Sequence, residues 1–266
     1  FHETHDNWNQ ITSDPVSGIA STLKGVAVDT AIGTVAGGAF GGGMTALSRS
    51  SEIVGRTVAN IKGDAGSLKM NEFVINDFHS NLDRLPQLKT KLDERTAASA
   101  AAGVPSEFNV AGDALSGHVN FAYTNGGEVE NQALAKMGLR NIIPGNHEYD
   151  APGGRFIPER YPTVMEPILR DNPQISLLNA NLGLSGYPDY AKLTKPYVVH
   201  EVQGPNGPEK VATVGLITEE GAVGKIRYED AAQTAIKTVR ELNGMGIKNI
   251  KLLTHLGLDE DKKLAQ

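Results

Sequence analysis

Four short apolar runs between Phe73 and Thr254 each lead into an aspartate, an asparagine or a histidine. The polar residues that follow these runs are Asp77 and His79, Asp113, Asn146 and His147, and His255. In open α/β sheets, ligands bind in the crevice at the carboxyl ends of the strands. Side chains that are far apart in the chain can therefore meet at one edge of a sheet. The sequence thus predicts one polar site assembled from several strand ends.

From Glu72 onward, short apolar runs alternate with longer amphipathic stretches. This alternation predicts a sheet with helices packed on its faces. Strands are expected at 73–76, 108–111, 141–143, 175–179, 197–203, 211–218 and 249–254, and helices at 82–95, 129–137 and 230–243. Pro86 is expected in the first turn of the first helix, where proline is tolerated. A turn at 204–207 is expected to pair the two strands around it.

Residues 1–70 have a different composition and hold eleven of the thirty glycines. No charged residue occurs from Thr30 to Ser48, and Gly33, Gly37 and Gly41 recur there at a spacing of four. On a helix these glycines would share one face and permit close contact with another helix or within a membrane. A flexible or docked leader is the favoured alternative. No basic segment precedes the run, so a cleavable signal peptide is not indicated.

The composition excludes several classes of chemistry. The chain has no cysteine, which removes disulfides, thiolate zinc sites, iron–sulfur clusters and cysteine nucleophiles. Its formal net charge of −6 argues against a broad nucleic-acid-binding face, and no nucleic-acid partner is expected.

The residue types at the strand ends are those of a metal site. Carboxylate, amide oxygen and imidazole suit manganese, zinc, iron or cobalt, and a carboxylate such as Asp113 can bridge two ions. Taken singly, each residue has a simpler interpretation as a helix cap, a turn former or a loop histidine. Their joint occurrence in order favours the metal site. Gly112 and Gly145 are expected to permit tight turns there.

The motifs at the strand ends resemble those of a known family. Asp77-Phe78-His79, Gly112-Asp113, Gly145-Asn146-His147-Glu148 and His255-Leu256-Gly257 resemble the signature blocks of the calcineurin-like metallophosphoesterases. The segments NDFHSNL at 76–82, GNHEYD at 145–150 and THLGLDED at 254–261 are closer to the 5'-nucleotidase branch. The resemblance covers about 72–266. It implies a layered α/β/β/α sandwich of mixed sheets flanked by helices, with a phosphoesterase domain at 71–266. The resemblance does not cover 1–70, which the composition marks as a glycine-rich leader.

The resemblance also implies roles for individual residues. Two divalent metal ions (Mn, Zn, Fe or Co) are expected: Asp77 and His79 resemble the ligands of the first, Asn146 and His255 those of the second, and Asp113 the bridge. His147 resembles the histidine that protonates the leaving oxygen, and Asp150 the carboxylate that orients it. Asn146 and His147 are also expected to contact the substrate, whereas Glu148 is expected to be a structural carboxylate. The implied reaction is attack by a metal-bound hydroxide on nucleotides or related phosphomonoesters.

One departure from the family pattern leaves alternatives open. The pattern continues with a Gly-His-x-His block, whereas this sequence ends at Gln266 without one. The domain is therefore expected to lack its C-terminal end and to be inactive alone without those two ligands. The main alternative is a non-catalytic phosphoesterase-like binding or delivery module of a larger secreted or membrane-associated protein. A protein phosphatase or cyclic-nucleotide phosphodiesterase on the same scaffold is a third possibility. The family implies an exported location: periplasmic, cell-surface or secreted.

Overall fold

A computed structural model describes residue 68 and residues 70–115, 126–151, 155–204 and 207–264. The glycine run with Gly33, Gly37 and Gly41 lies outside the described residues, and the proposed boundary at residue 70 stays a prediction. In the part of the chain that the structure describes, no helix has both the length and the apolar character needed to cross a membrane.

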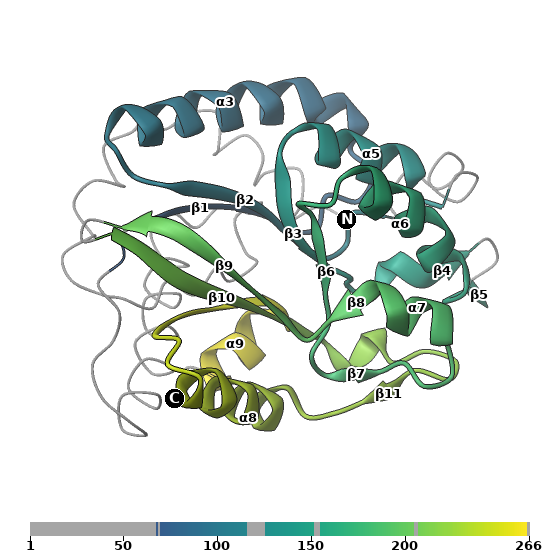
Figure 1. The fold of residues 1–266 in the computed structure, drawn as a ribbon. Coiled ribbons are helices and arrows are strands. Elements are labelled where there is room, and N and C mark those ends of the chain that lie inside the picture. The colour runs from purple at the N-terminus through teal and green to yellow at the C-terminus, as the bar shows by residue number, and fades with distance from the viewer. Residues whose placement is uncertain (1–67, 69, 116–125, 152–154, 205–206, 265–266) are drawn as a thin grey trace.

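The larger of the two main sheets is parallel throughout (Figure 1). Its order is β1-β2-β3-β6-β8, with strands β1 (Asn71–Ile75), β2 (Ser106–Ala111), β3 (Leu139–Ile143), β6 (Ser176–Leu178) and β8 (Thr194–Lys195). Parallel strands that are covered on both faces consist of almost continuous apolar residues, as the runs ending at Ile75, Ala111 and Ile143 do. Because the strands are parallel, their carboxyl ends share one edge.

The smaller sheet is mixed and consists of β9 (Tyr197–Gly204), β10 (Gly207–Ile217) and β12 (Asn249–His255). β10 is antiparallel to β9, where Gly207 pairs with Gly204 as the turn signal predicts, and parallel to β12. The carboxyl end of β12 therefore delivers His255 to the region where the first sheet ends.

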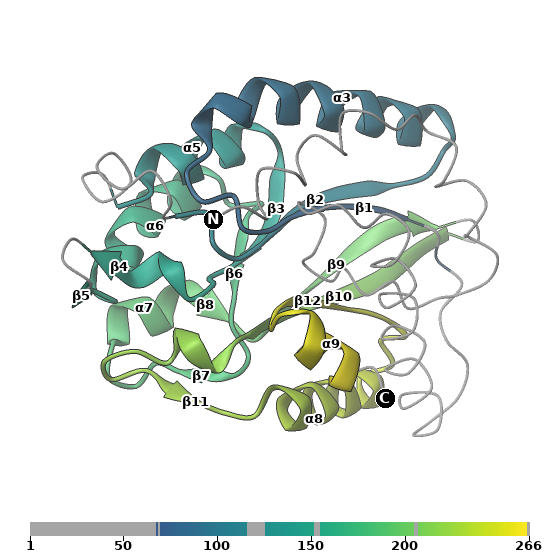
Figure 2. The ribbon, with the colours of Figure 1, turned by 180° about the vertical axis from the view of Figure 1, so that it is seen from behind.

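Helices cover the outer faces of the two sheets, and the four layers follow the order α/β/β/α (Figures 1 and 2). The helices α3 (Leu85–Ala101), α5 (Glu128–Lys136) and α6 (Arg160–Asp171) lie on the larger sheet, and α8 (Ala231–Gly244) and α9 (Leu258–Leu264) lie on the smaller one. One buried cluster joins Ile217 and Leu253 of the smaller sheet to the strands of the larger sheet, and another packs α8 on β10 and β12. The predicted layering is confirmed.

Most predicted elements occur close to their expected bounds, but α6 has no counterpart in the sequence analysis. Its apolar residues Tyr161, Val164, Met165 and Ile168 are buried at helical spacing. Pro162 and Pro167 conceal this pattern, since an interior proline usually ends or kinks a helix. The remaining elements are η1 (Leu82–Arg84), η2 (His147–Tyr149), β4 (Asp150–Ala151), β5 (Arg155–Phe156), β7 (Leu182–Gly183), α7 (Pro188–Leu193), η3 (Glu219–Gly221) and β11 (Arg227–Tyr228).

A charged cluster lies between the sheets near the beginnings of their strands. The Nζ atom of Lys251 in β12 lies 2.7 Å from Oε1 of Glu72 in β1 and 2.6 Å from Oε2 of Glu107 in β2. His200 of β9 makes an ion pair with Glu107, and Asn109 donates a hydrogen bond to Glu72. A cavity of about 390 Å³ opens beside Glu107 and His200 and contains none of the predicted metal ligands. The cluster therefore joins the two sheets at the edge away from the predicted site.

Candidate metal centre

The loops that follow β1 and β2 run side by side beyond the ends of the strands. The backbone N–H of Asp77 donates to Gly112 O at 3.2 Å, that of His79 to Asp113 O at 2.9 Å, and that of Ser80 to Ala114 O at 3.1 Å. Asp77, His79 and Asp113 all have positive φ, at 50°, 47° and 53°. Residues other than glycine rarely adopt this conformation, and such strain is concentrated at functional sites. The two loops therefore bring three predicted ligands to one edge.

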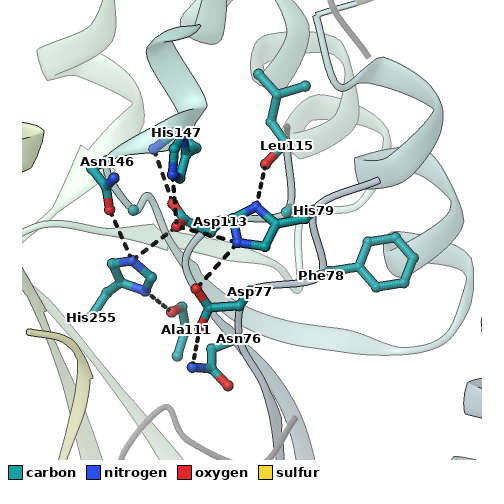
Figure 3. A network of polar contacts seen from close by, with 12 residues as sticks. Asn76, Asp77, Phe78, His79, Ala111, Asp113, Leu115, Asn146, His147 and His255 are labelled. Carbon is teal, nitrogen blue, oxygen red and sulfur yellow. Dashed lines mark hydrogen bonds and ion pairs between the residues drawn. The ribbon is translucent and has the colours of Figure 1, made fainter. Parts of the chain in front are cut away.

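The Asp113 carboxylate lies at the centre of the site (Figure 3). Its Oδ2 atom is 3.3 Å from Nε2 of His255 and 4.0 Å from Nε2 of both His79 and His147. The side chain of Asp113 is only 3% exposed. Three imidazole nitrogens from three separate segments thus face one buried carboxylate oxygen.

The remaining predicted ligands complete the same cluster. Oδ1 of Asp77 is 3.4 Å from Nε2 of His79, and Oδ1 of Asn146 is 3.3 Å from Nε2 of His255. Potential ligand atoms lie within 4.8 Å of one another in two overlapping groups, one formed by His79, Asp113 and His147, the other by Asp77, Asp113 and His255. Asp113 is common to both groups. The structure therefore brings together all six predicted strand-end residues.

Backbone carbonyls orient two of the histidines. Nδ1 of His255 lies 2.7 Å from Ala111 O, and Nδ1 of His79 lies 3.3 Å from Leu115 O. A carbonyl can only accept a hydrogen bond, so the proton is assigned to Nδ1 in both rings. In the neutral ring, Nε2 then presents its lone pair to the site, which is the arrangement of metal-binding histidines. Sequence motifs do not reveal these carbonyl partners, because the partners depend on backbone position.

His147 is oriented by a carboxylate instead. Its Nδ1 lies 2.7 Å from Oδ2 of Asp150, and its side chain is 38% exposed. The predicted pairing of these residues is therefore present in the geometry. Asp150 follows the short helix η2, so three residues of local structure position the carboxylate beside the ring. His147 is the most exposed of the histidines that face Asp113.

Glu148 binds the backbone of the loops that carry the site. It accepts hydrogen bonds from the N–H groups of Gly145 at 2.5 Å, Asp113 at 3.1 Å, Ala114 at 2.7 Å and Leu115 at 3.2 Å. Burial, together with the negative charge of Asp113, raises the pKa of Glu148 to about 7, although the backbone donors oppose this shift. The contacts agree with the expected structural carboxylate.

The electrostatics of the site favour a cation. Burial alone would lower the pKa of His255, but contact with Asp113 and the charges of Asp77 and Glu148 raise it to about 9. Burial likewise opposes ionisation of Asp113, whose pKa is nevertheless lowered by its contacts with His255 and His147. The cluster of carboxylates thus stabilises positive charge on His255. A divalent cation would meet the same negative potential.

Close packing explains both glycines in the loops. A Cβ on Gly112, whose φ is 86°, would lie 2.6 Å from Nδ1 of His255. A Cβ on Gly145 would overlap the carboxylate of Asp113. The glycines were expected to permit tight turns, but Gly145 is also required by the close approach of a proposed ligand. The donor set of carboxylates, imidazoles and one amide oxygen fits manganese, zinc, iron or cobalt.

No protein-family model matches the chain, whereas several curated proteins are similar to part of it. The NAD 5'-nucleotidase of Haemophilus influenzae is 30% identical over 166 residues, which are 59% of this chain and 24% of that protein. The probable 5'-nucleotidase of Treponema pallidum is 26% identical over 222 residues, covering 76% and 35%. The cell wall protein Lmo0130 of Listeria monocytogenes is 26% identical over 217 residues, covering 68% and 27%.

The fold has a counterpart among solved structures. The NAD nucleotidase of Haemophilus influenzae superposes with a TM-score of 0.59 and 24% identity, over 74% of this chain and 36% of that one. The chain spans only 24% to 35% of the length of the curated relatives named above. The similarity therefore concerns one part of longer proteins.

Proposed function

We propose that the described residues form the N-terminal metallophosphoesterase domain of the 5'-nucleotidase family. From this premise we infer that the domain hydrolyses phosphate monoesters of nucleotides. The observation that carries the proposal is the convergence of three imidazole Nε2 atoms on Oδ2 of Asp113. The names of the relatives support the nucleotide as the substrate class.

Two divalent cations are proposed at the site. Asp77 and His79 would hold one and Asn146 and His255 the other, as the resemblance implies, and Asp113 would hold both, because it belongs to both groups of neighbouring ligand atoms. Those groups themselves join His79 to His147 and Asp77 to His255 around Asp113. Bound cations stabilise the charge of the phosphoryl oxygens and make water a stronger acid. The residues themselves keep the ligand atoms within a few ångströms of each other before any cation is bound, so little rearrangement is needed.

His147 is proposed as the general acid. The leaving alcohol needs a proton as its bond to phosphorus breaks, and Nε2 of His147 faces the site at 4.0 Å from Asp113. Asp150 fixes the orientation of the ring through Nδ1. The amide of Asn146 lies on the same loop and would contact the phosphoryl group together with His147. An exported location is part of the proposal, supported by the name of the cell-wall relative from Listeria monocytogenes.

Phosphate release tests the proposal. A complete protein that supplies the Gly-His-x-His block is stripped of metal and reloaded with Mn²⁺ or Zn²⁺. It is assayed for phosphate release from nucleoside 5'-monophosphates, an aryl phosphate and a phosphopeptide, and for alcohol release from a phosphodiester. Metal-dependent release from the nucleoside monophosphates is expected, with loss of both metal binding and release in Asp113→Asn. Asp189→Asn is the control, because that carboxylate is 85% exposed on α7.

The panel separates the alternatives. Preference for the phosphopeptide or the diester would support a protein phosphatase or a phosphodiesterase instead. If no ester is hydrolysed and Asp113→Asn binds metal as the unaltered chain does, the proposed centre is refuted. Absence of bound metal in the unaltered chain would favour a non-catalytic module.

A further inference from the structure

The cavity of about 390 Å³ lies between α3, the first residues of β2 and β9, at the edge of the sandwich away from the candidate metal centre (Figure 1). Its wall includes the buried apolar side chains of Leu92, Phe108 and Val202 and the half-buried Met137. Binding sites for small organic molecules have volumes of about 300–1,000 Å³ and combine an apolar lining with a few polar groups. The cavity therefore has the size and the apolar wall of such a site.

Arg140 enters the wall of this cavity from a bulge in β3. In the pairing of β2 with β3, Phe108 is opposite Leu139, whereas the next residue, Asn109, is opposite Asn141. Arg140 is therefore one extra residue in its strand. Bulges are rare between parallel strands, and they turn side chains toward functional sites. The bulge thus gives Arg140 a position that a regular strand would not.

The side chain of Asn109 holds the bulge in place. Its Oδ1 atom accepts hydrogen bonds from the backbone N–H of Asn141 at 3.1 Å and from the side-chain amide of Asn141 at 2.8 Å. Its Nδ2 atom donates to Glu72, a member of the charged cluster between the sheets. A side chain thus accepts the N–H of Asn141 in place of a strand carbonyl. The position of Arg140 is fixed by these buried polar contacts.

The charge of Arg140 has no ionic partner in the part of the chain that the structure describes. Its Nη1 atom donates to Gln174 O at 3.3 Å, and none of the described carboxylates forms an ion pair with it. The acidic residues of the wall are matched by basic residues of their own: Lys251 and His200 for Glu107, Lys89 for Asp93, and Lys210 directly across the β9–β10 pair for Glu201. A guanidinium presents a planar fork of N–H groups that fits a carboxylate.

We propose that this cavity binds a small organic monocarboxylate, with the carboxylate on Arg140 and the apolar body against Leu92, Phe108 and Met137. One negative charge suffices, because one guanidinium is without an ionic partner there. The proposed site shares no residue with the candidate metal centre, so the inference goes beyond the proposed function and does not depend on it.

Titration of the full chain without added divalent metal tests the site. The probes are 4-phenylbutyrate, 4-phenylbutylamine and 4-phenylbutanol, which share an apolar body and differ in charge. In isothermal titration calorimetry, the acid should bind with a Kd at least about tenfold below those of the amine and the alcohol, because hydrogen bonds to a charged group contribute about that factor. Arg140→Gln should raise the Kd for the acid by about the same factor and leave that for the alcohol unchanged.

Three further variants separate the charge, the cavity and a general effect. Arg140→Lys keeps the charge without the planar fork, and its Kd for the acid should lie between those of Arg140→Gln and the unaltered chain. Thr96 is exposed on α3 and lines the cavity, so Thr96→Trp should fill it and abolish binding of the acid and the alcohol alike. Arg170→Gln removes an exposed arginine that pairs with Asp171 on α6, and should change no Kd.

The inference is overturned if the acid does not bind the unaltered chain, if the amine binds as tightly as the acid, or if Arg140→Gln leaves the Kd for the acid unchanged. Urea denaturation shows whether each variant folds. If Arg140→Gln does not fold, Arg140→Lys and Thr96→Trp decide, and an unchanged Kd for the acid in both overturns the site. Phosphate release does not enter these measurements, so their failure leaves the proposed function standing.

Discussion

The carboxylate of Glu148 binds the backbone of Asp113, with Oε2 3.1 Å from the Asp113 amide nitrogen. The same carboxylate accepts from Gly145, Ala114 and Leu115, so one buried side chain joins the loops after β2 and β3. Asp113 in turn accepts a hydrogen bond from the N–H of His147 at 3.0 Å. The loop that carries the central carboxylate and the loop that carries Asn146 and His147 therefore support each other.

Removing the Glu148 carboxylate should weaken both stability and metal binding. Glu148→Ala leaves four buried N–H groups without acceptors, and we expect the free energy of unfolding to fall by about 3–5 kcal/mol. Glu148→Gln keeps one acceptor oxygen and should lie between Glu148→Ala and the unaltered chain. Urea denaturation and zinc titration measure the two effects. Glu166→Gln on the exposed face of α6 is the control. If Glu166→Gln lowers stability and metal affinity as much as Glu148→Ala does, the role given to the Glu148 carboxylate is wrong.

Gly145→Ala should disrupt the site without removing a ligand. The added Cβ overlaps the Asp113 carboxylate, so that side chain must move away from the histidines. Metal affinity is expected to fall at least about tenfold, which corresponds to about 1.4 kcal/mol. Gly244→Ala is the matched control, because a Cβ there meets nothing within 4 Å. Isothermal titration calorimetry with Zn²⁺ measures the metal affinity of both variants. Equal affinities would show that the loop accommodates the added methyl group without moving Asp113.

Metal affinity should rise with pH through the neutral range. The pKa of His255 is raised to about 9, so without metal this ring is protonated at pH 7 and a cation must displace the proton. Below about pH 9, affinity should increase by up to about tenfold per pH unit for this one proton. Calorimetry of Mn²⁺ binding in two buffers of different ionisation enthalpy counts the released protons. Proton release should stay near one per cation between pH 6 and 8, and an affinity that does not vary with pH there, with no proton released, would contradict the assignment.

The buried charges between the sheets should make the domain sensitive to acid. Burial opposes ionisation of Glu107, but His200 and Lys251 outweigh it and lower the pKa to about 2. A carboxyl with a depressed pKa stabilises the folded state above its unfolded pKa, and that contribution is lost as the pH falls. Stability should therefore decline between about pH 4.5 and pH 2. Glu107→Gln should flatten this decline in denaturation curves, and an unchanged slope would exclude Glu107 as its cause.

Lys251→Met tests the same cluster at neutral pH. It leaves the carboxylates of Glu72 and Glu107 without their shared cation, and breaking a buried pair in this way typically destabilises by about 3–5 kcal/mol. Lys192→Met breaks an exposed pair with Asp189 and should change stability by no more than about 1 kcal/mol. Denaturation midpoints of the two variants provide the comparison. Similar small losses would mean that the cluster contributes little.

Local signals predicted most of the fold. The runs that became β1, β2, β3 and β12 are short and mostly apolar, as strands covered on both faces require, although polar residues such as Asn109 and Lys251 interrupt them. Helix α8 was expected at 230–243 because its apolar residues repeat at helical spacing, and it occupies Ala231–Gly244. Helix α6 was missed because Pro167 lies in its interior, where tertiary packing of Tyr161 and Met165 outweighs the unfavourable local preference.

The candidate site, like the fold, was predictable from the sequence only in part. The sequence by itself determined the residue types at the strand ends and the glycines beside them, because these depend only on local order. The tertiary structure decided that Nε2 rather than Nδ1 of His79 and His255 faces the site, since carbonyls of other segments accept from Nδ1. It also placed the Glu148 carboxylate on the backbone of two loops. These relationships arise from strand register and sheet packing. Both bring together residues that are distant in the sequence, so the order of residues along the chain does not predict the contacts.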